Sequence, residues 1–146
     1  MKHMYQYQFR FYLDAQNEQF FRRQCIVPLD WKLGTVKHYL EQSLGVPMKE
    51  CICLGRMDVY LLQSEIRQDS SSKTAGIEAY WSDVKEYSVA LSEAQHSESI
   101  YVLTDYSTDE QLVKERLQPL FPSKQIRVDY DADCWLLKER DCDGSV

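Results

Sequence analysis

The chain has 146 residues, enough for one domain or for two small ones. Its hydrophobic fraction of 44% and its charged fraction of 27% are those of an ordinary soluble protein, and its ten tyrosines favour a packed fold over a disordered chain. The net charge of −6 argues against nucleic acid as a partner, because nucleic-acid-binding proteins usually carry an excess of basic residues.

The sequence shows no sign of a membrane or secretory segment. No run approaches the roughly 18 apolar residues of a membrane-spanning helix, and the opening "MKHMYQYQFRF" lacks the apolar region of a signal peptide. The five cysteines are an odd number, which favours reduced thiols. We therefore expect a cytoplasmic or nuclear protein that does not bind membranes.

Two strands are predicted at the start of the chain. Aromatic and polar residues alternate in "YQYQFRFYL", residues 5–13, as in a half-buried strand. The polar segment "DAQNEQ" follows, and "FFRRQCIVPL", residues 20–29, predicts a second strand. Together they indicate a hairpin with a longer loop.

An amphipathic helix is predicted over residues 31–44. Asp30 stands where a residue can cap the start of the helix. Gly45 and Pro47 end it, because glycine adopts the left-handed conformation and proline forbids continuation. The residues expected on its buried face, spaced three and four apart, are Leu33, Val36, Leu40 and Leu44.

The chain is then expected to return to the sheet twice. "ECICL", residues 50–54, predicts a short strand with Gly55 at its turn, and "DVYLL", residues 58–62, predicts a fourth strand. The polar segment Arg67–Gly76 is predicted to be a loop. The order strand, strand, helix, strand, strand lays one helix across a mixed sheet.

The second half repeats this plan. Residues 85–91 and 99–105 are strand-like, and Asp105 or Thr108 stands where it can cap a helix within residues 109–121. Residues 124–137 then return as a strand.

An internal repeat relates the two halves. Residues 46–62 match residues 121–137 without a gap, with five identities in seventeen positions. Chance can produce this number, but the same order of elements surrounds both segments, so we favour duplication. The identical pairs are Pro47 and Pro122, Lys49 and Lys124, Asp58 and Asp133, Leu61 and Leu136, and Leu62 and Leu137.

The first helix and its exit resemble ubiquitin. Over about the first sixty residues, the matching positions are Val36, Lys37, Leu40, Gly45, Val46 and Pro47 in the helix and its stop, and Ile52, Gly55 and Arg56 in "CICLGR". The connection after Pro47 is shorter than in ubiquitin itself. The resemblance implies an α+β fold of the ubiquitin-like β-grasp type.

With the repeat, the resemblance implies a tandem pair of ubiquitin-like domains. The expected division places one domain at residues 1–83 and a second, degenerate unit at residues 84–146, incomplete because little chain remains for a final strand. In a competing division, "KEYSVALSE" is the fifth strand of the first unit, and residues from Glu93 onward form a strand-helix-strand extension.

The resemblance also implies a non-catalytic role. The chain ends "RDCDGSV" and lacks the Gly-Gly tail of a conjugated modifier, so it looks like a ubiquitin-like domain built into a larger protein. Similar domains are appended to ubiquitin-specific proteases, where they bind partners or regulate the catalytic domain. The expected partner is then a protein, either a catalytic domain in the same chain or a member of the ubiquitin pathway.

Two other functions stay open. One is a stand-alone acidic binding or inhibitor protein, for example from a phage or virus, that acts on a basic protein target. The other is a small enzyme that uses a thiol, which needs an exposed cysteine of lowered pKa.

The residues with possible chemistry favour structural roles. Cys51 and Cys53 lack the spacing of a metal site and should pack beneath the helix. His38 and His96 have no catalytic signature around them. The carboxylates of "DYDADC", residues 129–134, lack the glycine and glutamate of a calcium loop and indicate a solvated strand. We expect no catalytic, cofactor-binding or metal-binding residue.

The expected protein-binding residues are Ile52, Gly55, Arg56 and Trp81. Alternation in "ECICL" turns Ile52 outward, beside the turn at Gly55 and Arg56, as in the surface with which ubiquitin engages its receptors. The equally weighted alternative is that the second unit or the Arg67–Gly76 loop covers Ile52. Trp81 is expected to be a wedge between the two units, because tryptophan is common at interfaces.

Overall fold

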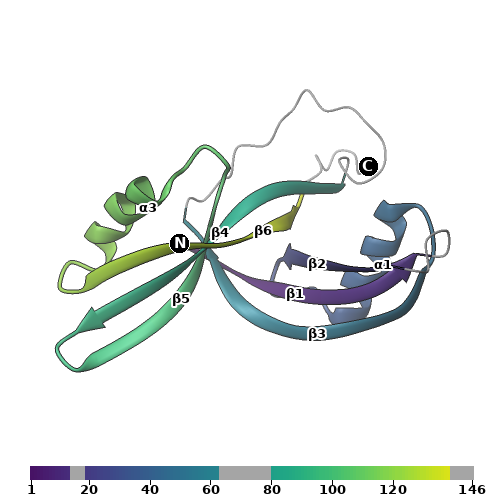
Figure 1. Cartoon of the computed structure of the whole chain (residues 1–146), viewed down its shortest axis with the longest axis horizontal. Helices are drawn as coiled ribbons and strands as arrows, with labels where there is room; N and C mark the ends of the chain where they lie inside the picture. The colour runs from purple at the N-terminus through teal and green to yellow at the C-terminus, as the bar shows by residue number, and fades with distance from the viewer. Residues whose placement is uncertain (14–18, 63–79, 139–146) are drawn as a thin grey trace.

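The computed structural model describes residues 1–13, 19–62 and 80–138 (Figure 1). These ranges contain six β-strands, two α-helices and one short 3-10 helix. In chain order they are β1 (Lys2–Leu13), β2 (Phe20–Val27), α1 (Leu33–Leu44), β3 (Met48–Leu61), β4 (Trp81–Glu93), β5 (His96–Thr104), α3 (Glu110–Leu117), η2 (Gln118–Leu120) and β6 (Gln125–Leu137).

The strands close into one barrel in the order β1-β2-β6-β4-β5-β3. Within each half the pairing is antiparallel: β1 pairs with β2 and β3, and β4 pairs with β5 and β6. Short parallel contacts join the halves, β2 to β6 and β3 to β5. In Figure 1 the strands cross near the middle, with β1, β2, β3 and α1 extending to one side and β5 and α3 to the other.

Each half folds as strand, strand, helix, strand, and the register shows an internal repeat. The gap-free match of residues 46–62 with 121–137 places Tyr60 at the position of Trp135. These two residues make equivalent parallel pairs, Tyr60 with Val102 of β5 and Trp135 with Cys25 of β2. The two halves are therefore related by an approximate two-fold axis through the barrel.

The predicted fold class, a tandem of ubiquitin-like β-grasp domains with an incomplete second unit, is wrong. Both halves contribute to one closed barrel, and the second half has the same four elements as the first. The error lies in β3, which continues through Gly55 where we expected a turn between two strands. Two register shifts against β1 bend this strand, and such bulges change its direction without ending it.

The predicted domain division falls inside a strand. The boundary after Asp83 lies within β4, which runs from Trp81 to Glu93. The strand pairs of the described residues join β4 to β5 and β6, the other strands of the second half. The predicted Arg67–Gly76 loop lies outside the described residues.

Three apolar clusters hold the fold together. The barrel interior receives side chains from all six strands, among them Val59 and Leu103. On the outer face of β1–β3, α1 buries Val36 and Leu40 completely. On the outer face of β4–β6, α3 contributes Val113 and Leu117. The burial of each helix on one sheet face is the main stabilisation that such short helices can have.

Most of the prediction for the first helix is confirmed. Gly45 ends α1 in the left-handed conformation, with φ of 77°, as predicted. Two details are wrong. Leu33 is 41% exposed because it begins the helix, beyond the buried face. The capping position belongs to Lys32, whose side chain makes no capping hydrogen bond, so Asp30 lies too far upstream.

The start of the second helix also differs from the prediction. Asp109 caps α3, accepting a hydrogen bond from the Leu112 amide at 2.9 Å. Asp105 instead orders the preceding turn, because its carboxylate accepts a hydrogen bond from the Thr108 hydroxyl at 2.8 Å.

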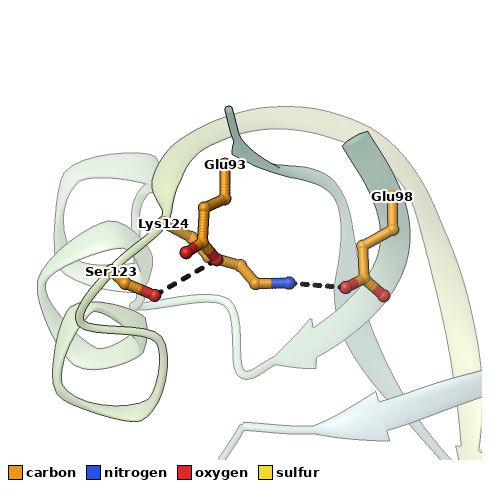
Figure 2. A network of polar contacts seen from close by, with 4 residues as sticks. All are labelled: Glu93, Glu98, Ser123 and Lys124. Carbon is orange, nitrogen blue, oxygen red and sulfur yellow. Dashed lines mark hydrogen bonds and ion pairs between the residues drawn. The ribbon is translucent and has the colours of Figure 1, made fainter. Parts of the chain in front are cut away.

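Polar contacts attach the start of β6 to the β4–β5 hairpin (Figure 2). The Lys124 ammonium lies 2.7 Å from the Glu98 carboxylate, and the Ser123 hydroxyl donates a hydrogen bond to Glu93 at 3.3 Å. These groups are at the surface, where ion pairs contribute little stability. Their role is to orient the turn after α3.

Candidate functional site

The structure separates the four residues that the sequence analysis assigned to protein binding. Ile52 is 45% exposed, and the register with β1 places Gly55 on the same sheet face, away from α1. Arg56 lies on the opposite face, with its guanidinium over the Tyr5 ring, 4.2 Å from the centroid. Trp81 lies in the core beneath α1 and is 3% exposed.

Trp81 is held in the core by a hydrogen bond. Its ring nitrogen donates to the Ser43 hydroxyl at 2.8 Å, and that hydroxyl donates to the Leu40 carbonyl at 2.8 Å. The ring therefore anchors α1 to β4 and has almost no surface open to a partner.

Nine residues form the face of β1, β2 and β3 that lies opposite α1, which we call the open face. The register sets them in three rows across the strands, in the order β2, β1, β3. From the barrel outward, the rows are Gln24–Gln8–Gly55, Arg22–Arg10–Ile52 and Phe20–Tyr12–Lys49.

Apolar and aromatic groups are exposed on the open face. Phe20 is 50% exposed and Ile52 is 45% exposed. The Arg10 guanidinium lies over the Phe20 ring, 5.7 Å from its centroid, and the Tyr12 ring meets Phe20 edge-on at 6.5 Å. Leu54, at a β-bulge of β3 beside Ile52, is 43% exposed. Exposed apolar groups clustered beside cations are a common feature of binding surfaces.

Two cations of the open face stand directly opposite each other. Arg10 and Arg22 are cross-strand partners, and like charges in such pairs are destabilising. Within the described residues, neither arginine has an ion pair with a carboxylate. None of the nine residues of the open face is acidic. Among the described residues, the row therefore presents positive charge that no carboxylate pairs with.

Sequence analysis did not select Arg10 or Arg22, because their adjacency depends on the register between β1 and β2. A signal was present in the charge distribution. Residues 1–80 contain ten Lys and Arg and nine Asp and Glu, whereas residues 81–146 contain seven and fourteen. The net negative charge belongs to the second half, and the open face belongs to the first.

A polar cluster lies inside the barrel, where the open face continues inward. The Gln6 side-chain amide donates to the Glu86 carboxylate and contacts the Cys134 sulfur at 3.4 Å, and the Gln8 side-chain amide donates to Oε1 of Gln6 at 2.8 Å. Gln6 and Glu86 are 0% and 1% exposed. Burial, with a smaller contribution from Asp131, raises the pKa of Glu86 to about 8.

The thiols of the described residues have structural positions. Cys25 and Cys134 are buried, and burial raises the pKa of both thiols far above the ordinary value. Cys51 and Cys53 pack at the edge of the α1 cluster, as predicted, and burial raises the pKa of Cys51. A raised pKa disfavours the thiolate, which is the reactive form of cysteine.

The described ranges contain no group of three His, Cys, Asp or Glu side chains that could hold a metal ion. The three aspartates of "DYDADC", Asp129, Asp131 and Asp133, are exposed on β6, as predicted for a solvated strand. Asp133 accepts a hydrogen bond from the Tyr130 hydroxyl at 2.6 Å, which raises the pKa of Tyr130 to about 12.

Comparisons of the chain with protein families, with curated proteins and with solved structures find no match. Among the described helices, none is long and apolar enough to cross a membrane.

Proposed function

We propose that this chain is a protein-binding module and that the open face is its binding surface. The observation that carries the proposal is the pairing of Ile52 and Phe20, both about half exposed, with Arg10 and Arg22 on one sheet face. Aromatic and arginine side chains supply much of the binding energy at protein interfaces. The opposite face of the same strands is buried against α1, so a partner that binds these strands by a sheet face would bind the open face.

This proposal keeps only part of the function expected from the sequence. A role in protein interaction or regulation within a larger protein is retained. The link to a deubiquitinase came from the ubiquitin-like fold, and we do not carry it further because the chain forms a six-stranded barrel.

The test compares the proteins that the full chain binds in cells with those bound by two variants. Ile52→Asp places a charge on the open face, and Leu120→Asp makes the same change at a 52% exposed position of η2. We expect at least one partner that is lost with Ile52→Asp and retained with Leu120→Asp. If the original protein and both variants bind the same proteins, the open face is not the binding surface.

The charge distribution supports a second candidate function, an acidic inhibitor of a basic protein target. Residues 81–146 carry fourteen acidic and seven basic residues, and Asp129, Asp131 and Asp133 are exposed together on β6. Replacing these three aspartates with Asn distinguishes the candidates. It should abolish partner binding if the acidic half is the binding surface and leave it intact if the open face is.

A further inference from the structure

We propose that the partner of the open face is an acidic protein segment that also carries apolar side chains. This inference rests on the proposed function and specifies the chemistry of the partner. A carboxylate of that segment binds between Arg10 and Arg22, and separate apolar side chains of the segment pack on Ile52 and on Phe20.

The first argument is the arginine pair, which has no ion pair with a carboxylate among the described residues. Two like charges directly opposite in a sheet repel each other, and a bound carboxylate converts this repulsion into two charge-assisted hydrogen bonds. Arg10 is also positioned by its stacking on Phe20, at 5.7 Å from the ring centroid. A guanidinium held in place loses less side-chain freedom when it binds an anion.

The second argument is the neighbour of this pair in the same row. Ile52 stands directly across from Arg10 on β3, so one row presents Arg22, Arg10 and then an exposed aliphatic side chain. Adjacent strands lie about 4.8 Å apart. A segment that crosses the sheet therefore meets two cations and an apolar contact within the reach of neighbouring side chains.

Both arguments favour a protein segment over nucleic acid. Single-stranded nucleic acid binds through bases stacked on aromatic rings, but one face of the Phe20 ring is occupied by Arg10, and Ile52 offers no ring. The net charge of the chain is −6, which repels a polyanion that extends beyond the open face. A short acidic segment with apolar side chains matches the local charge and the local surface.

Selection from a random peptide library displayed on phage, with the immobilised full chain as target, tests the inference. We expect the selected peptides to be enriched in Asp and Glu together with apolar residues, relative to the starting library. Peptides without acidic enrichment, or no selected peptide that binds the open face, would overturn the inference.

The strongest selected peptide is then synthesised with a fluorescent label, and its affinity is measured by anisotropy against variants of the full chain. Arg10→Gln/Arg22→Gln should weaken binding by roughly tenfold or more, since it removes two charge-assisted contacts. The matched control Lys114→Gln/Arg116→Gln, on α3, should leave the affinity unchanged. The open-face variant removes a repulsive pair together with the Arg10–Phe20 contact, so circular dichroism first establishes that both variants are folded at the assay temperature, and weakened binding then reports the lost contacts with the peptide.

The remaining outcomes separate the two proposals. If Ile52→Asp abolishes binding of the peptide but Arg10→Gln/Arg22→Gln does not, the proposal of an acidic partner is wrong, and the proposal that the open face binds a protein still stands. A labelled oligothymidylate that binds more tightly than the peptide, and depends on both arginines, overturns the inference in favour of nucleic acid.

Discussion

Gln6 and Glu86 hydrogen-bond to each other inside the barrel and occupy equivalent positions in the two halves. Gln6 pairs across β1 and β3 with Met57, and Glu86 pairs across β4 and β6 with Ala132. Met57 and Ala132 correspond in the gap-free match between the halves. The approximate two-fold axis therefore passes between an amide donor and a carboxyl acceptor, and this hydrogen bond links the two halves at the centre of the fold.

The burial of Glu86 at this position predicts that its contribution to the free energy of unfolding falls as pH rises. The pKa of Glu86 is raised from 4.5 to about 8, mainly by burial, so the folded protein binds this proton more tightly than the unfolded chain does. The contribution of Glu86 to stability is then complete below about pH 4.5, declines between 4.5 and about 8, and is constant above.

The variant Glu86→Gln isolates this effect. It keeps the size of the side chain and its polarity, and it removes the buried charge. Above pH 8 the variant should be more stable than the original chain by about 1–3 kcal/mol, the scale of a poorly solvated buried group. Urea unfolding at acid and alkaline pH measures this difference, and an equal difference at both pH values contradicts the assignment.

A second prediction concerns the packing of α1. Leu40 is completely buried against β1–β3, so Leu40→Ala should lower the free energy of unfolding by about 2–5 kcal/mol. Leu33, in the same helix, is 41% exposed, and Leu33→Ala should change the free energy of unfolding by no more than about 0.5 kcal/mol. Chemical denaturation measures both, and similar costs for the two leucines would mean that the buried face of α1 is misassigned.

Local pattern was enough to predict most elements but not their assembly. Alternation predicted β1, the hairpin pattern predicted β2, and the Gly45 stop predicted the end of α1, because these features depend on neighbouring residues. The parallel contacts of β2 with β6 and of β3 with β5 bring together distant parts of the chain. Nothing in the local pattern separates a closed barrel from two sheets that each hold one helix.

The candidate site was predictable to the same partial extent. The alternation of Cys51, Ile52 and Cys53 correctly predicted which side chains face α1 and which do not. The position of Arg10 between Arg22 and Ile52 was not predictable, because it requires the register of three strands at once.

A third prediction concerns the hydrogen bond that anchors Trp81. Trp81→Phe keeps most of the ring in the core and removes the donor to Ser43, so it should lower the free energy of unfolding by about 1–3 kcal/mol. Ser43→Ala provides the matched change on the other side of the contact. Because the two residues share this bond, the double variant should cost less than the two single changes together. Fully additive costs in denaturation experiments would show that the hydrogen bond contributes nothing.

A fourth prediction concerns the thiols. Cys25 and Cys134 are buried and their pKa values are raised, so neither should react with a thiol reagent while the protein is folded. Both should react after unfolding in urea. Mass spectrometry of peptides from the folded and unfolded samples locates the modified residues. Rapid modification of Cys134 in the folded protein would indicate an accessible thiol and revive the thiol-enzyme hypothesis.

The last prediction separates binding from folding at Ile52. Because Ile52 is 45% exposed on the open face, Ile52→Asp should change the free energy of unfolding by no more than about 0.5 kcal/mol. Val59, in the same strand, is completely buried in the barrel interior, so Val59→Asp places a charge where no water solvates it and should prevent folding. Circular dichroism and thermal unfolding of the full chain distinguish the two. If Ile52→Asp also unfolds the protein, Ile52 is a core residue, and the register of β3 against β1 is shifted by one position.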